Sequence, residues 1–107
     1  MSDEIEITVT GRKTGKQITH PVWFVEEGDT LYLLPVTGSD SEWVKNVLEH
    51  PTITLAANGA EWHAKAKPIT DPARVHHVVE QFRKKYGASE IEKYYSKTDV
   101  AVEIPLH

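Results

Sequence analysis

The chain has no cysteine among its 107 residues, and this absence excludes several classes of chemistry. Disulfide scaffolds, thiol catalysis and cysteine-ligated metal sites all need the missing side chain. Long apolar runs are also missing, since no stretch approaches the roughly 18 residues that a membrane-spanning helix needs. The polar start, from Met1 to Glu4, is not that of a signal peptide. We therefore expect a cytoplasmic protein without a membrane span.

An excess of positive charge is missing too. The formal net charge of −4 argues against a general binder of nucleic acid or of membrane surfaces. Aromatic residues interleaved with basic ones, which single-strand binders use, are not evident either. Repeats, low-complexity segments and linkers are absent from the sequence. A chain of this length is sufficient for one modest core, so we expect residues 1–107 to form a single domain.

Apolar periodicity predicts a mostly β structure. Strand patterns cover residues 5–9, 17–25, 30–36, 52–57, 60–69 and 100–106. Helical patterns with cap signals cover residues 42–49, 72–86 and 89–95. Because six short strands joined mostly by hairpins leave exposed edges in an open sheet, closure into a barrel is favoured. The predicted fold is α+β: a six-stranded, mainly antiparallel split barrel with two or three helices packed outside.

Several local signals sharpen this prediction. Pro21 cannot donate a ladder hydrogen bond, so the second strand should have an irregular or edge-like point there. The pair Asn58-Gly59 predicts a hairpin turn. Asp71 followed by Pro72 predicts the start of the main helix. The first helix should bury four apolar residues, namely Trp43, Val44, Val47 and Leu48.

The first strand leads into a basic loop, residues 11–16, whose sequence is GRKTGK. Its two glycines allow positive φ angles and close approach of a ligand to the backbone. Arg12 offers a planar fork of donors, while Lys13 and Lys16 are compact charges. This inventory suits a phosphate or a carboxylate. The loop is either an anion site or a solvated hairpin turn with ordinary surface charge.

The basic loop, the Pro21 strand, Gly28-Asp29 before an apolar strand, the sequence WVKN at residues 43–46 and His50-Pro51 follow one another in a familiar order. Over residues 8–51 the chain resembles the split β-barrel flavin and deazaflavin oxidoreductases, within the pyridoxamine-phosphate-oxidase-like superfamily. It is most similar to the deazaflavin-dependent nitroreductase and quinone-reductase family.

This resemblance implies a function. The cofactor would be the deazaflavin coenzyme (F-420), with flavin mononucleotide (FMN) as the alternative. Reduced cofactor would pass a hydride to a small acceptor such as a quinone, a nitro compound or an enone. The cofactor carries this chemistry, so no nucleophile or metal is required. A second interpretation is a non-catalytic flavin or deazaflavin binding or storage protein of the same fold. Split-barrel relatives often dimerise, and we expect a homodimer.

The resemblance also assigns cofactor contacts to four segments. These are the loop that grips the phosphate and acidic tail (Arg12, Lys13, Thr14, Gly15, Lys16), the strand beneath the ring (His20, Pro21, Val22), the small-residue loop (Thr37, Gly38, Ser39) and the bordering helix (Trp43, Asn46). Catalytic residues are not assigned. Two departures from the family pattern stand out: only a few residues precede the first strand, and Asp40 adds a negative charge beside the small-residue loop.

Other conspicuous residues have quieter interpretations. We expect the tryptophans at positions 23, 43 and 62 to be core or interface residues, with Trp43 the best candidate for an exception because it lies beside the proposed site. The pair Tyr94-Tyr95 should pack the short helix against the barrel. His20 and His63 should line one barrel face, as structural residues or as donors and proton relays.

Overall fold

The computed structural model describes residues 4–57 and 59–106. Within these residues it contains seven strands, three α-helices and one short 3₁₀ helix. In chain order they are β1 (Glu4–Thr10), β2 (Gln17–Glu27), β3 (Thr30–Leu33), η1 (Gly38–Asp40), α1 (Glu42–Glu49), β4 (Thr52–Ala57), β5 (Ala60–Lys65), β6 (Lys67–Ile69), α2 (Pro72–Tyr86), α3 (Ala88–Tyr94) and β7 (Ala101–Pro105).

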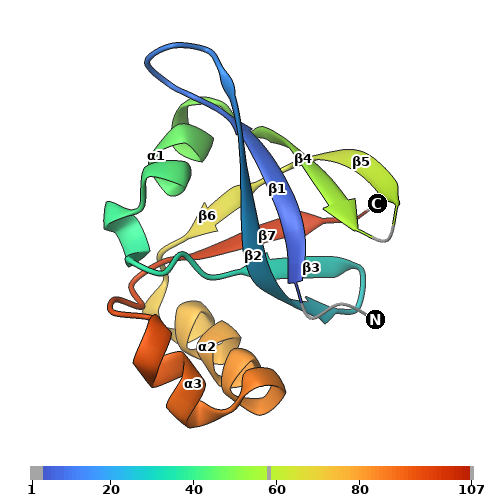
Figure 1. Cartoon of the computed structure of the whole chain (residues 1–107). Coiled ribbons are helices and arrows are strands. Elements are labelled where there is room, and N and C mark those ends of the chain that lie inside the picture. The colour runs from blue at the N-terminus through green and yellow to red at the C-terminus, as the bar shows by residue number, and fades with distance from the viewer. Residues whose placement is uncertain (1–3, 58, 107) are drawn as a thin grey trace.

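The strands form a curled half-barrel in the order β5-β4-β1-β2-β3-β7-β6, and all strand pairings among the described residues are antiparallel (Figure 1). The predicted fold class is therefore confirmed, with seven strands instead of six. The difference lies at residues 60–69, which we predicted as one strand. Ala66 donates its N–H to the Pro51 carbonyl at 2.8 Å, and the chain changes partner there: β5 pairs with β4, whereas β6 pairs with β7.

Strand β2 joins the two halves of the sheet. Its residues 17–23 pair with β1, and residues 24–27 pair with β3. The Gly11 N–H donates to the Lys16 carbonyl at 2.7 Å, so by alternation Pro21 falls in a non-hydrogen-bonded pair with β1. The missing N–H of Pro21 therefore points to the other edge of β2, which no described strand covers. This confirms the predicted edge-like point.

Two apolar cores lie on the two faces of the sheet. The first fills the inside of the curl and includes Ile7, Leu33, Leu55 and the α1 residues Trp43, Val44 and Val47. The second packs α2 and α3 against the outer face of the sheet, around Val78, Phe82 and Ile91. Figure 1 shows α2 and α3 together below the strands, with α1 above them. None of the described helices is both long and apolar enough to cross a membrane.

The helix signals were reliable, with one error. Helix α1 has the predicted bounds, and the Asp71 side chain accepts the Arg74 N–H at 3.1 Å to cap α2. Leu48, predicted to be buried, is 65% exposed because it points away from the barrel. The pairing of Ala57 with Ala60 confirms the hairpin, although Asn58 itself lies outside the described residues.

Helix α2 fastens β2 at the point where this strand changes partner. The Tyr86 hydroxyl donates to the Phe24 carbonyl and accepts from the Phe24 N–H, both at 3.0 Å. Lys85 Nζ donates to the same carbonyl at 2.7 Å. The Trp23 ring stacks on Tyr86 with 4.3 Å between centroids. These contacts hold β2 at the point where its pairing passes from β1 to β3.

Candidate functional site

A cavity of about 480 Å³ opens where β2 and β3 diverge. Residues from β1, β2, the segment after β3, α1 and α3 line it: Glu4, His20, Pro21, Val22, Trp23, Leu34, Val36, Ser41, Trp43, Glu90, Tyr94 and Tyr95. Its volume lies within the range of small-molecule sites, which are mostly apolar with a few polar groups.

One wall of the cavity is aromatic. Trp23 meets Tyr94 edge to face at 5.8 Å and lies 6.1 Å from the ring of Tyr95. Burial raises the pKa of the Tyr95 hydroxyl, so this group stays protonated and able to donate a hydrogen bond. A wall of this kind suits a flat ligand that carries a polar edge.

The open edge of β2 forms another wall. Because Pro21 falls in a non-hydrogen-bonded pair with β1, alternation turns the backbone groups of Thr19, Pro21 and Trp23 toward this edge. These carbonyl and N–H groups are fixed donors and acceptors beside an apolar space. The strand therefore offers a polar edge to a planar ligand without using a charged side chain.

The basic loop is tied to α1 through Arg12. Its guanidinium donates to Asn46 Oδ1 at 2.8 Å and pairs with the Glu42 carboxylate at 2.6 Å, while its backbone N–H also donates to Asn46 Oδ1 at 3.1 Å. The hydrogen bond from Arg12 is the main cause that lowers the pKa of the Glu42 carboxyl. The structure thus brings Arg12 and Asn46 together, one helical turn from Trp43. The Arg12 fork, however, is engaged within the protein.

Lys13 and Lys16 are placed differently. Both are exposed, and in the described part of the chain neither ammonium group forms a hydrogen bond or an ion pair. The turn beneath them is closed by the Gly15 N–H, which donates to the Gly11 carbonyl at 2.8 Å, with Gly15 at φ 74°. These two lysines are the cations of the loop that remain available to an anion.

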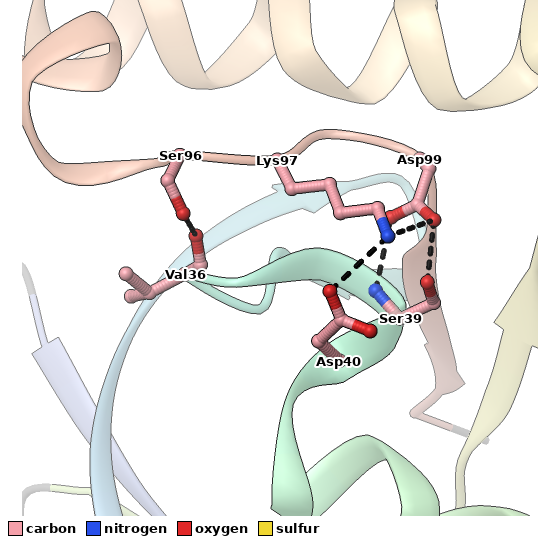
Figure 2. A network of polar contacts seen from close by, with 6 residues as sticks. All are labelled: Val36, Ser39, Asp40, Ser96, Lys97 and Asp99. Atoms are coloured by element: carbon pink, nitrogen blue, oxygen red, sulfur yellow. Dashed lines mark hydrogen bonds and ion pairs between the residues drawn. The ribbon is translucent and has the colours of Figure 1, made fainter.

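The small-residue loop is occupied by a carboxylate of the chain itself (Figure 2). The N–H and hydroxyl of Ser39 donate to the two oxygens of Asp99 at 2.9 and 2.5 Å. Lys97 Nζ lies 3.2 Å from Asp40 Oδ2 and 3.7 Å from Asp99 Oδ2. We call these four residues the Asp99 clasp. Its single ammonium group is shared by two carboxylates, so it offsets only part of their charge. The clasp holds the segment after α3 against the segment before α1.

The sequence of residues 1–106 matches the family model described as F420H(2)-dependent quinone reductase. The chain belongs to this family. Reduced deazaflavin is the family's cofactor, and it is favoured here over FMN. No curated protein matches the chain.

Solved structures share the fold. A structure described as F420-H2 dependent reductase (FDR-A) has a TM-score of 0.73 and 20% identity, with 95% of this chain and 93% of that chain covered. HutZ, the heme storage protein from Vibrio cholerae, has a TM-score of 0.73 and 12% identity, covering 96% and 80%. A putative pyridoxamine 5'-phosphate oxidase from Listeria innocua has a TM-score of 0.70 and 16% identity, covering 99% and 86%.

The predicted site residues of this family member fall into two groups. The first group lines the cavity: His20, Pro21, Val22 and Trp43. The second group does not line it and consists of the basic loop, the small-residue loop and Asn46, which contacts Arg12. His63 is separate from His20: its ring lies 3.0 Å from Thr54 Oγ1 on β4, and β5 stands three places from β2 in the sheet.

Sequence reasoning missed much of the cavity. Trp23, Leu34, Val36, Glu90 and the pair Tyr94-Tyr95 line it. The tyrosine pair and Trp23 were interpreted as packing residues, and they do pack on one another. Val36 was predicted inside the strand 30–36, but β3 ends at Leu33, and Val36 lies beyond it at the cavity with 51% of its surface exposed.

The Asp99 clasp should make stability depend on pH. The hydrogen bond from the Ser39 side chain is the main cause that lowers the pKa of Asp99. The Asp99 carboxyl therefore releases its proton more readily in the folded state than in the unfolded state. The stabilisation is present above about pH 4 and is lost as pH falls through the lowered pKa. Because the Asp99 side chain is 41% exposed, we expect the wild type to exceed Asp99→Asn by only about 0.5–1 kcal/mol at pH 6.5.

Urea unfolding of both proteins between pH 2.5 and 7 measures this advantage. It should vanish toward pH 2.5, where the carboxylate is protonated. An advantage that stays constant across the whole range would contradict the assignment to an ionised Asp99.

Proposed function

We propose that the chain is a cytoplasmic oxidoreductase that transfers a hydride from reduced deazaflavin to a small acceptor, such as a quinone, a nitro compound or an enone. The observation that carries the proposal is the aromatic-walled cavity along the open edge of β2, in a member of the F420H(2)-dependent quinone reductase family. The basic loop contacts α1 through Arg12 and Asn46, one helical turn from Trp43, which lines this cavity.

The residues present fit a planar ring with an anionic tail. Trp23 and Trp43 give the cavity flat apolar walls, and the unpaired backbone of β2 supplies polar partners for the edge of a ring. Lys13 and Lys16 are available to the tail. In this assignment Ser39 binds no phosphate, because Asp99 already uses both of its donors.

The deazaflavin supplies the hydride when it is bound, and the protein supplies position and electrostatics. The cavity walls hold the reacting groups in contact and limit the access of water. The Tyr95 hydroxyl stays protonated and can donate to an acceptor oxygen, and His20 can carry a proton within the cavity.

A side-by-side titration tests the proposal. Oxidised and reduced deazaflavin and FMN are titrated into the protein, and the cofactor that binds is then offered quinone, nitro and enone acceptors. We expect the deazaflavin to bind more tightly and its reduced form to be consumed by at least one acceptor class. The absence of binding by either cofactor would refute the assignment.

The same titration distinguishes the reductase from the alternative, a non-catalytic binding or storage protein. This alternative is favoured by the shared fold with HutZ, which is described as a heme storage protein. Such a protein would show affinity for the reduced cofactor without its consumption by any acceptor.

We also propose that the chain forms a homodimer. Val36 is 51% exposed and Tyr94 is 47% exposed, and both lie at the cavity, so a second copy packed there would cover apolar surface. Sedimentation at micromolar concentration should give twice the mass of the chain. A monomeric mass would contradict the proposal.

A further inference from the structure

The cavity has an uneven distribution of charge. Two carboxylates line it, Glu4 on β1 and Glu90 on α3, and His20 is its one histidine. Within the described residues, neither a lysine nor an arginine belongs to the lining. In the part of the chain that the structure describes, the free cations of the proposed site, Lys13 and Lys16, belong to the basic loop and not to the cavity lining.

Positive groups on the surrounding elements are engaged elsewhere. Lys97 pairs with Asp40 and Asp99, which also anchor the clasp. Arg12 pairs with Glu42 beside α1. On α3 itself, Lys93 does not line the cavity, but its Nζ lies 5.2 Å from the ring centre of Tyr94, which does, so Lys93 offsets part of the negative charge there. The charges that meet a molecule inside the cavity are therefore mainly negative.

Aromatic faces act in the same direction. Trp23 and Trp43 line the cavity together with the two carboxylates, and within the described residues neither a lysine nor an arginine lies over their rings. An organic cation is attracted by the face of an aromatic ring and by a carboxylate, whereas an anion is repelled by both. Partial exclusion of water inside the cavity strengthens these effects relative to open solution.

We propose that the cavity selects acceptors by charge: it accepts those that carry a cationic substituent and rejects those that carry a carboxylate or a sulfonate. Glu90 is the specificity-determining residue, with Glu4 in support. The inference rests on the proposed function. The acceptor takes up the hydride and one proton, both of which the reduced cofactor releases, so a charged substituent leaves the stoichiometry of the reaction unchanged.

Three benzoquinones with one common core test the inference. They carry a trimethylammonium, a hydroxyl or a sulfonate group on the same alkyl spacer, which keeps their reduction potentials close. We expect kcat/KM to fall from the cationic to the neutral to the anionic quinone, by about tenfold from first to last at low salt. Added salt should narrow the range, because Glu90 is only half-buried and dissolved ions screen such a charge.

Variants of α3 assign the effect to one side chain. Glu90→Gln should reduce the preference to about threefold, and Glu90→Lys should reverse it. Glu92→Gln is the matched control, because Glu92 is exposed on the same helix and lies outside the cavity lining. Calorimetric binding of the same quinones to the cofactor-free protein should show the same order, so the test does not depend on turnover.

The outcomes separate the inference from the proposed function. Equal reduction of all three quinones would overturn charge selection and leave the reductase in place. Equal effects of Glu90→Gln and Glu92→Gln would show that net charge, not the cavity, sets the preference. If none of the quinones is reduced, the proposed quinone reduction fails, and the order of the calorimetric affinities still decides whether the cavity selects by charge.

Discussion

Replacing Lys13 and Lys16 together by alanine should weaken the binding of reduced deazaflavin by about 100-fold while leaving the free energy of unfolding almost unchanged. Each lysine would give a charge-assisted hydrogen bond to an anionic tail, worth about 1.5–3 kcal/mol before screening by solvent. Neither side chain supports the fold, because both are exposed and form no hydrogen bond or ion pair within residues 4–57 and 59–106.

The matched control is the double variant Lys67→Ala with Lys84→Ala. This control removes two positive charges, as the loop variant does, but from β6 and α2, where Lys67 and Lys84 are exposed. Fluorescence titration of the cofactor measures the affinity of each protein, and urea unfolding measures its stability. An equal loss of affinity in the two double variants would show a general effect of charge and would remove the basic loop from the site.

Arg12 should behave differently from the two lysines. The family resemblance predicts that Arg12 binds the cofactor directly. In the structure its guanidinium contacts Glu42 and Asn46, and Asn46 is only 4% exposed. Its main effect on the site therefore acts through the position of α1 and the loop. A comparison of the lysine variants with an arginine variant would separate direct contact with the tail from support of the loop.

The elements were predictable wherever one local signal decided them. Helix α1 and strand β4 have the predicted bounds because Pro51 separates them and each keeps its own apolar period. The break at Ala66 was difficult to predict, since the alternation of apolar residues runs up to Ala66 and loses its phase only at Ile69. Only the pairing of β5 with β4 and of β6 with β7 divides that segment, and this choice of partner is a property of the whole sheet.

The site was predictable where the motif itself forms part of it. His20, Pro21, Val22 and Trp43 follow from the family resemblance, and they line the cavity. Its aromatic wall depends on the divergence of β2 from β3 and on the placement of α3. The Asp99 clasp likewise joins residues 39 and 99, sixty positions apart, without a repeating pattern that could reveal the contact.

The clasp leaves no room for a side chain at Gly38. Replacing this glycine should therefore have the largest effect on stability that we expect outside the cores. Gly38 has φ 58°, and a Cβ atom there would lie 2.2 Å from Asp99 Oδ1 and 3.0 Å from the Lys97 carbonyl oxygen. An L-residue in the left-handed region costs about 1–2 kcal/mol, and relief of the clash would separate Asp99 from Ser39 as well. Gly38→Ala should therefore lower the free energy of unfolding by about 3 kcal/mol.

Gly28 provides a matched control, because its φ of 61° is nearly the same and a Cβ atom there would meet nothing within 4 Å. Gly28→Ala should show the conformational cost alone, about 1 kcal/mol. Urea unfolding of the two variants isolates the clash as the difference between them. In the double variant Gly38→Ala with Asp99→Ala, the two effects should be less than additive, because the loss of the carboxylate removes the nearest obstacle. Equal destabilisation by Gly38→Ala and Gly28→Ala would mean that the clasp rearranges around the added methyl group without a cost in stability.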